Sequence, residues 1–334
     1  MVVCTLGTII LIFLLTLGFF KVISKLTMGW CKSNTCLVGK TVIITGGNSG
    51  IGFQTAMALA GRGAKVIIGD VVNSDDSVKQ IISETNNPNV RGKHLDLGSL
   101  DSVRKFCKEI YEEEDRLDIL INNAGVGGAP LGHTSDGIQI HMQINYFGHF
   151  LLTHLLIGLL KRNKSRIIFV SSIAAFKHNL SLETLNNPTV FKQDLKTHFT
   201  IYGNSKLCEL IASNIFAEKL KNTTITSNAV YPGTVNTPII HNTGGVDAFK
   251  YSKMFAKFCL FVGGKTPYEG AQTQINCALS RDLDGVSGKY FVDCKPFYQP
   301  RLARDKEFCK QLWDESERLV KLKPEEKIEN VLRG

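Results

Sequence analysis

The hydrophobic positions of this chain fall into short, uninterrupted runs that alternate with longer stretches in which apolar and polar residues are mixed. Uninterrupted apolar runs are typical of strands buried on both faces of a parallel sheet, and mixed stretches are typical of amphipathic helices. The alternation therefore predicts an α/β fold, with a single doubly wound, Rossmann-type parallel sheet. We expect its strands at residues 40–45, 65–69, 90–95, 117–122, 165–171, 224–231 and 288–292.

The mixed stretches predict the helices that cover this sheet. No internal repeat or linker-like segment interrupts the pattern, which indicates one domain at residues 38–295. A helical tail is expected at 296–334, fraying over its polar end at 321–334. The helices of the domain are expected at 53–62, 99–113, 139–160, 202–220 and 267–279, with a further polar helix between 71 and the break at 86–88.

The chain begins with an uncharged apolar run over residues 2–20. As a helix this run would span about 28 Å, close to the hydrocarbon thickness of a bilayer. A cleaved signal peptide is the alternative, but no Lys or Arg precedes the run. We therefore expect a transmembrane anchor at 1–21 and a basic juxtamembrane linker at 22–37. Because Lys21, Lys25 and Lys32 follow the run, the positive-inside tendency places the main domain in the cytosol.

The formal charge of +9 is unevenly distributed, because no Asp or Glu occurs before Asp70. A basic cluster beside an apolar run fits a bilayer surface better than a nucleic acid, and no compact basic motif occurs elsewhere. We therefore expect a membrane partner and no nucleic-acid partner. The nine cysteines are irregularly spaced, which indicates free thiols in a reducing compartment.

A glycine-rich segment, Thr-Gly-Gly-Asn-Ser-Gly-Ile-Gly at 45–52, joins the first strand to the first helix. Its glycines permit a tight turn, and the helix N-terminus after it offers free N–H groups to a pyrophosphate. An ordinary tight turn is the alternative, but the position between a strand and a helix favours a dinucleotide site. The residues expected to contact the cofactor here are Gly46, Asn48, Ser49, Gly50, Ile51 and Gly52.

Polar residues end the next strands at the same edge of the predicted sheet. Asp70 ends the second strand, where a carboxylate accepts hydrogen bonds from ribose hydroxyls and repels a 2′-phosphate. Neither Val71 nor Ser49 supplies a cation for that phosphate, so NAD is expected, with NADP as the alternative. A solvated strand-end carboxylate is the other interpretation of Asp70. Asp96, after the third strand, and Asn123-Ala124-Gly125, after the fourth, are further candidates for cofactor contact.

Tyr202 and Lys206 are four residues apart on one predicted helix and therefore share a face. A neighbouring ammonium favours the phenolate form of a tyrosine, which suits the phenol for acid/base work. Ser172 ends the fifth strand and is a candidate to hydrogen-bond a substrate oxygen, with an ordinary strand-end serine as the alternative. Asn145 lies within an apolar helix and needs hydrogen-bond partners there, in a structural or a catalytic role.

These pieces stand in the order typical of the short-chain dehydrogenase/reductases, which residues 38–295 resemble. The resemblance implies a dinucleotide-binding catalytic domain in which Tyr202 is the acid/base. It implies that Lys206 binds the nicotinamide ribose and assists the tyrosine, so that both also contact the cofactor. It further implies that Ser172 polarises the substrate oxygen and that Asn145 holds a water in a proton relay. The residues it places at the nicotinamide are Pro232, Gly233, Val235 and Thr237.

The segments 148–156, 231–235 and 265–273 also resemble the membrane-anchored retinol dehydrogenases. This likeness implies interconversion of a lipophilic, retinol-like alcohol and its aldehyde or ketone, at the endoplasmic reticulum or alternatively the lipid droplet. The other readings are a steroid or isoprenoid alcohol dehydrogenase and a catalytically weak membrane scaffold that retains the fold. Many retinal-reducing members carry an arginine after the second strand and prefer NADP, whereas Asp70-Val71 stands here, which favours NAD.

The stretch 239–262 is rich in Phe, Ile, Leu and Met. It is expected either to cover an apolar substrate or to form a surface helix pair packed on the sheet. His141, His149 and His154 suggest a metal site, but no Cys or carboxylate completes a ligand spacing, so no metal is expected. A homo-oligomer is compatible with the sequence.

Overall fold

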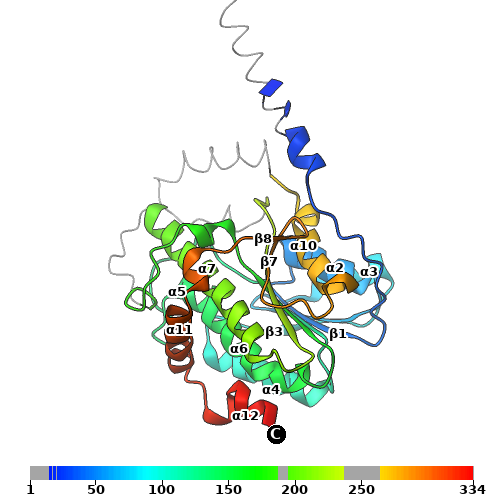
Figure 1. The fold of residues 1–334 in the computed structure, drawn as a ribbon. Helices are drawn as coiled ribbons and strands as arrows, with labels where there is room; N and C mark the ends of the chain where they lie inside the picture. Colours follow the sequence, from blue (N-terminus) through cyan, green and yellow to red (C-terminus); the bar gives the residue numbers. More distant parts are fainter. Residues whose placement is uncertain (1–14, 17, 20, 187–194, 237–263, 334) are drawn as a thin grey trace, which may run out of the picture.

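The computed structural model describes residues 15, 16, 18, 19, 21–186, 195–236 and 264–333. In this part of the chain eight strands form one sheet in the order β3-β2-β1-β4-β5-β6-β7-β8, and every neighbouring pair is parallel except β7 and β8. The predicted doubly wound α/β fold is confirmed (Figure 1). The strands are β1 Thr41–Thr45, β2 Lys65–Asp70, β3 Val90–His94, β4 Ile119–Asn122, β5 Arg166–Val170, β6 Thr226–Tyr231, β7 Tyr290–Val292 and β8 Lys295–Phe297.

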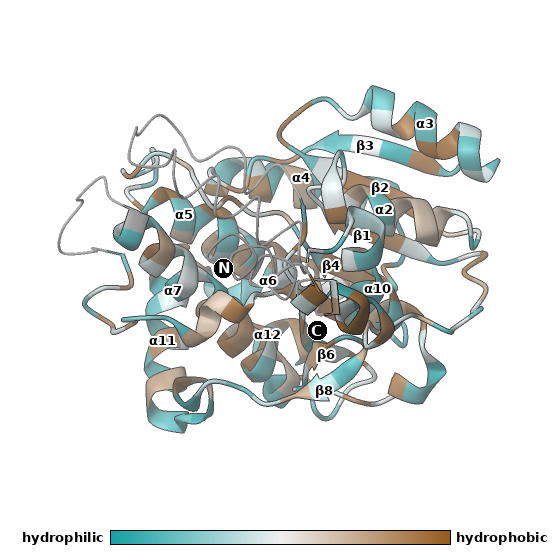
Figure 2. Cartoon of the chain, turned by 90° about the horizontal axis from the view of Figure 1, so that it is seen from above, coloured by the Kyte–Doolittle hydropathy of each residue, from teal (hydrophilic) through white to brown (hydrophobic). Residues whose placement is uncertain are grey.

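The central strands are apolar throughout because each is buried on both faces. Along β1, Ile43 packs into one hydrophobic core, whereas Val42 and Ile44 pack into the other. Successive side chains of a strand point to opposite faces, so one apolar run supplies both cores. The edge strand β3 differs, since its exposed positions alternate with less exposed ones and it is coloured largely hydrophilic in Figure 2.

Two layers of helices enclose the sheet. The core that contains Val42 also contains side chains from α2, α3 and α10, and the core that contains Ile43 contains side chains from α4, α6 and α7. The chain then adds α11 and α12 outside the second layer (Figure 1). The longer helices are α2 Gly50–Ala60, α3 Asp75–Thr85, α4 Leu100–Glu113, α6 Gly148–Leu160, α7 Leu195–Lys219, α10 Pro267–Leu279, α11 Lys306–Leu319 and α12 Ile328–Arg333.

The C-terminal end is ordered, and the expectation that it frays over 321–334 is wrong for its described residues, 321–333. Ile328 is buried, and Val331 and Leu332 pack against the same core. These three residues share one face of α12 because they are spaced at i, i+3 and i+4. Arg104 of α4 also donates to the carbonyl oxygen of Lys321 at 3.0 Å. The tail therefore closes one side of the domain.

The N-terminal segment passes over the edge of the sheet at which the parallel strands end. Lys25 pairs with Glu269 in the first turn of α10, with 2.6 Å between Nζ and Oε2. The N–H group of Gly29 donates to the carboxylate of Asp293, directly after β7, at 3.2 Å. In Figure 1 this segment leaves the domain beside α10.

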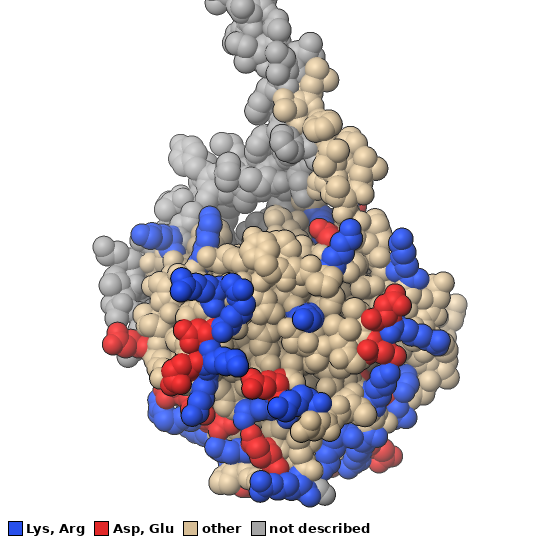
Figure 3. Space-filling model, in the orientation of Figure 1, with Lys and Arg blue, Asp and Glu red and all other residues tan. Residues whose placement is uncertain are grey.

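The transmembrane anchor predicted for 1–21 lies mostly outside the described residues, which include only 15, 16, 18, 19 and 21 of that range. No helix among the described residues combines the length and the apolarity that a membrane crossing requires. On the face of the domain in Figure 3, Lys and Arg side chains are interspersed with Asp and Glu side chains.

Candidate active site

The predicted site residues that the structure describes lie at the carboxyl ends of the parallel strands. The chain runs outward from β1 through β2 to β3, and then crosses back to β4 on the other side of β1. In open α/β sheets, ligands bind outside the carboxyl ends of the strands at such a switch of strand order. The turns after β1 and β4 are therefore neighbours, and the two predicted groups of cofactor contacts meet there.

The glycine turn after β1 is packed too tightly for side chains. A Cβ atom on Gly52 would lie 2.1 Å from the carbonyl oxygen of Gly46 and 2.5 Å from Nδ2 of Asn123. Gly46 itself has a φ of 68°, a backbone conformation that favours glycine. Ser49 at the N-cap of α2 forms no side-chain hydrogen bond to the first turn. The turn thus leaves N–H donors of the helix to an anion, as a pyrophosphate site requires.

Asp70 lies beside the glycine turn at the end of β2. One carboxylate oxygen accepts from the N–H group of Asn48 at 3.3 Å and the other from that of Val72 at 3.2 Å. The side chain of Asn48 donates in turn to the carbonyl oxygen of Val72 at 2.9 Å, while its Oδ1 is buried without a hydrogen-bond partner among the described residues. This acceptor and the carboxylate suit the hydroxyls of a nucleotide ribose.

The polar residues after β3 and after β4 make different kinds of hydrogen bond. The carboxylate of Asp96 accepts from the N–H group of Gly98 at 2.8 Å and thereby shapes its own turn. Asn123 binds the carbonyl oxygen of Thr45 through its side chain at 2.8 Å. The N–H groups of Asn123 and Ala124 both donate to the hydroxyl oxygen of Thr45, at 2.9 and 3.0 Å. The segment 123–125 is therefore fastened to the end of β1.

Tyr202 and Lys206 lie on α7, at the carboxyl end of β5. The Nζ atom of Lys206 is 5.7 Å from the centre of the Tyr202 ring and donates to the carbonyl oxygen of Val170 at 2.9 Å. A Cβ atom on Gly125 would lie 3.2 Å from the same Nζ. Lys206 is buried, whereas Tyr202 is partly exposed. One ammonium thus lies between the phenol and the backbone after β4.

Gly203 explains how α7 comes so close to the end of β5. A Cβ atom there would lie 2.3 Å from the carbonyl oxygen of Lys177 and 2.8 Å from that of Ala174. These carbonyls belong to the 3-10 turn η2, Ile173–Phe176, and to the residue after it. Ser172 is the N-cap of η2, and its hydroxyl oxygen accepts from the N–H group of Ala174 at 3.1 Å. The structure therefore places Ser172 and Tyr202 on two elements in direct backbone contact.

The predicted helix at 139–160 contains a π-helical turn, η1 Gln143–Phe147, between α5 Ile140–Met142 and α6. Asn145 lies in this turn. Single π-helical turns within α-helices frequently occur at functional sites. Its Nδ2 donates to the carbonyl oxygen of Val126 at 3.0 Å and to the hydroxyl of Ser205 at 2.9 Å, and its Oδ1 accepts from the N–H group of Val126 at 2.7 Å. The side chain therefore ties the loop after β4 to α7; the water relay stays a prediction.

The segment after β6 lies beside the glycine turn. Val235 forms an isolated parallel bridge with Lys265 and packs so closely on α10 that a Cβ atom on Gly270 would lie 2.6 Å from Val235 and 3.4 Å from Ile51. Lys265 donates to the carbonyl oxygen of Pro232 at 3.1 Å. Gly233 has a φ of 97°. Thr237 and the predicted cover at 239–262 lie outside the described residues.

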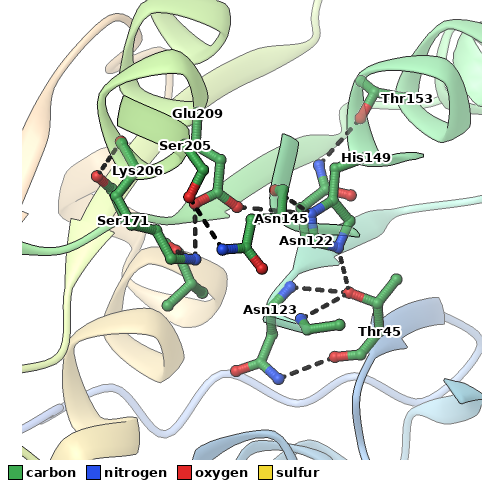
Figure 4. Close-up of polar contacts among 12 residues, drawn as sticks. Thr45, Asn122, Asn123, Asn145, His149, Thr153, Ser171, Ser205, Lys206 and Glu209 are labelled. Carbon is green, nitrogen blue, oxygen red and sulfur yellow. Dashed lines mark hydrogen bonds and ion pairs between the residues drawn. The ribbon is translucent and has the colours of Figure 1, made fainter. Parts of the chain in front are cut away.

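Two buried residues, Glu209 and His149, lie behind Lys206 (Figure 4) and were not predicted as catalytic or cofactor-binding residues. The carboxylate of Glu209 lies 2.7 Å from Nζ of Lys206 and 3.5 Å from Nδ1 of His149. The other ring nitrogen of His149 lies 2.8 Å from the hydroxyl of Thr45. The sequence suggests His149 only as a metal ligand. The one available signal for Glu209 was its i+3 spacing from Lys206, which places both on one helix face.

Comparisons with known proteins identify the family of this chain. The family model described as short chain dehydrogenase matches residues 40–184. Human retinol dehydrogenase 13 is 40% identical over 300 residues, covering 89% of this chain and 89% of that protein. Bovine (Bos taurus) retinol dehydrogenase 12 is 38% identical over 291 residues, covering 86% and 88%, and human retinol dehydrogenase 11 is 37% identical over 311 residues, covering 92% and 94%.

Solved structures share the fold. A crystal structure of an uncharacterized protein from Mycobacterium paratuberculosis matches with a TM-score of 0.68 and 27% identity, covering 88% of this chain and 98% of that one. A short chain dehydrogenase from Shigella flexneri 2a str. 301, complexed with NADP, matches with a TM-score of 0.57 and 20% identity, covering 78% and 100%. The chain belongs to the short-chain dehydrogenase family, with retinol dehydrogenases among its relatives, and is an oxidoreductase acting on CH–OH groups.

Proposed function

We propose that this protein is an NAD(H)-dependent dehydrogenase that interconverts a lipophilic, retinol-like alcohol and its aldehyde, with Tyr202 as the acid/base. The observation that carries the proposal is the position of the Lys206 ammonium, 5.7 Å from the Tyr202 ring and against the backbone of Gly125 at the cofactor edge. An ammonium in this place favours the phenolate and serves the ribose hydroxyls of a bound nucleotide.

In the oxidative direction each residue of the site has its own role. When bound, NAD supplies the nicotinamide ring that accepts hydride from the carbon bearing the hydroxyl group. Tyr202 removes the hydroxyl proton, and Ser172 hydrogen-bonds the substrate oxygen. Lys206 holds the ribose and favours the charged phenol. The glycine turn holds the pyrophosphate, and Asp70 holds the adenosine ribose and disfavours a 2′-phosphate.

The route of a lipophilic substrate follows from the position of the N-terminal segment. Through Lys25 and Gly29 this segment is fixed at the same edge of the sheet as the site. Trp30 and Tyr268 form an exposed aromatic pair there, with ring centres 5.9 Å apart. Trp and Tyr are enriched at membrane interfaces. We therefore propose a membrane-bound enzyme whose site faces the bilayer, with the catalytic domain in the cytosol and the endoplasmic reticulum as its membrane; a homo-oligomer stays a prediction.

The test is NADH formation by membranes that carry the full chain, supplied with NAD and all-trans-retinol. The account predicts turnover in the wild type and at least about a hundredfold loss in Tyr202→Phe, with nucleotide binding retained. Tyr111→Phe is the matched control, because its hydroxyl binds the carbonyl oxygen of Leu155 away from the site. Equal rates in wild type and Tyr202→Phe would contradict the role of Tyr202. If the enzyme oxidises steroid or isoprenoid alcohols and not retinol, the proposed retinol-like substrate is wrong and one of these classes takes its place.

A further inference from the structure

Glu209 is a fully buried carboxylate directly behind the proposed catalytic pair. On α7 it lies three residues after Lys206 and seven after Tyr202, so the three side chains share one helix face. Acidic side chains are almost never fully buried unless they are paired. Its position therefore requires a charged partner.

That partner is Lys206, whose Nζ lies 2.7 Å from Oε2 of Glu209. Burial alone would lower the pKa of Lys206, but the negative charge of Glu209, with a smaller contribution from Tyr202, raises the pKa above its usual value. The raised pKa keeps Lys206 charged beside the Glu209 carboxylate. The phenol of Tyr202 therefore faces an ion pair and not a lone positive charge.

The other side of Glu209 faces a histidine whose tautomer follows from its hydrogen bonds. The hydroxyl oxygen of Thr45 already accepts two backbone N–H groups, so its own proton donates to the carbonyl oxygen of Ile121 at 3.5 Å or to Nε2 of His149 at 2.8 Å, and the shorter contact is the one to Nε2. Nε2 then accepts, and the ring proton is on Nδ1. Nδ1 lies 2.9 Å from the carbonyl oxygen of Asn145 and 3.5 Å from Oε1 of Glu209. The Nδ1–H group therefore donates to Asn145, and His149 lies beside Glu209 without a hydrogen bond to its carboxylate.

Three further titratable side chains near the pair, all among the described residues, stay uncharged. Burial raises the pKa of Cys208, which follows Lys206 on α7, and that of Tyr290 on β7. Burial also raises the pKa of Tyr231, at the end of β6. Within the described part of the chain, the charge close to Tyr202 is therefore set mainly by Lys206 and Glu209.

We propose that Glu209 is a positioning residue that fixes the Lys206 ammonium and offsets part of its charge at the Tyr202 ring. A lone ammonium 5.7 Å from that ring would strongly favour the phenolate, whereas a carboxylate 2.7 Å from the ammonium weakens this effect. Glu209 thus makes the surroundings of the phenol less positive than a lone ammonium would. The inference rests on the proposed function only in giving Tyr202 the role of acid/base.

The experiment is a titration of tyrosinate absorbance in the full-length protein without nucleotide or substrate. Subtracting the signal of Tyr202→Phe isolates the ionisation of Tyr202. The proposal predicts that Glu209→Gln moves the midpoint of this signal about one pH unit lower. The matched control is Glu114→Gln, because Glu114 is a buried carboxylate that pairs with Lys65 at 2.7 Å and lies at the opposite edge of the sheet. It is expected to leave the midpoint unchanged.

A double variant, Lys206→Met with Glu209→Gln, keeps the test decisive if the single variant fails to fold. It removes both charges of the pair, so the midpoint is expected within about half a pH unit of the wild type. A rise of more than about one unit would show that Glu209 offsets little of the Lys206 charge and would overturn the proposal. An unchanged midpoint in folded Glu209→Gln would do the same. Because the titration uses no substrate, either result is independent of whether the protein oxidises retinol.

Discussion

The glycine turn and the Tyr202 helix lie at the same edge of the sheet but are built in opposite ways. The turn is made of backbone and missing side chains, since a Cβ atom on Gly52 would meet the carbonyl oxygen of Gly46 at 2.1 Å. Behind Tyr202 the structure is instead a buried series of polar side chains, Lys206, Glu209 and His149, ending at Thr45. The first region depends on steric fit and the second on charge, so substitutions in the two regions are expected to impair different properties of the enzyme.

The steric region gives the largest expected effect. Gly52→Ala inserts a methyl group into backbone atoms that cannot move away, which displaces the start of α2 from the turn. We expect nucleotide affinity to fall at least about a hundredfold, measured by isothermal titration with NAD. Gly61→Ala is the control at the other end of α2, where the nearest heavy atom would be 3.4 Å from the new Cβ. Similar losses in both variants would show a general helix effect and not a packed turn.

Gly203→Ala introduces a steric conflict in the catalytic region. The new methyl group would lie 2.3 Å from the carbonyl oxygen of Lys177, so α7 must move away from η2. Overpacking of this kind costs about 1–3 kcal/mol of unfolding free energy. Turnover is expected to fall about thirtyfold while NAD affinity stays near the wild-type value. Chemical denaturation and binding measurements check both parts, and a loss of NAD affinity equal to the loss of turnover would argue against separate regions.

Asp70→Ala tests the charge that the turn region does contain. Removing the carboxylate takes away hydrogen bonds to the adenosine ribose and the repulsion of a 2′-phosphate. NAD affinity is expected to fall about tenfold, which is about 1.4 kcal/mol, and NADP affinity is expected to rise. Asp115→Ala is the control, because Asp115 is exposed and lies before β4, at the opposite edge of the sheet, and it is expected to change neither affinity. If the wild type binds NADP as tightly as NAD and Asp70→Ala changes neither, the cofactor argument is wrong.

The smallest effect on the site is expected for His154, which concerns the pH dependence of folding. His154 is buried among Phe150, Phe216 and Trp313, and this burial lowers its pKa to about 4. Between pH 6.5 and about 4 the unfolded chain binds a proton that the folded chain does not, so stability is lost as the pH falls through this window. The slope is at most about 1.4 kcal/mol per pH unit for one histidine. His154→Gln should reduce it in denaturant titrations, and exposed His94→Gln should not.

The difference between the regions also explains what the sequence could predict. Strands such as β1 and β5 were predicted to within a residue or so at each end because their apolar runs need no partner to be recognised. The glycine turn was equally visible, since its spacing follows from local geometry. The edge strand β8 was missed because Lys295–Phe297 is exposed and exists only through its pairing with β7.

The buried polar series could not be read from the sequence for a related reason. Glu209 and His149 are 60 positions apart, and nothing local in either helix shows that their side chains are 3.5 Å from each other. The packed C-terminal end is a different case. Ile328, Val331 and Leu332 have the spacing of an apolar helix face, but the charged residues around them obscured it.

The central claim is that the turn region selects NAD while the Tyr202 region transfers the proton. The most direct measurement compares NADH and NADPH formation from all-trans-retinol by membranes that carry the wild type or Tyr202→Phe. The account predicts a kcat/KM at least about tenfold higher with NAD than with NADP, and loss of both activities in the variant. Equal use of NAD and NADP, or a variant as active as the wild type, would contradict it.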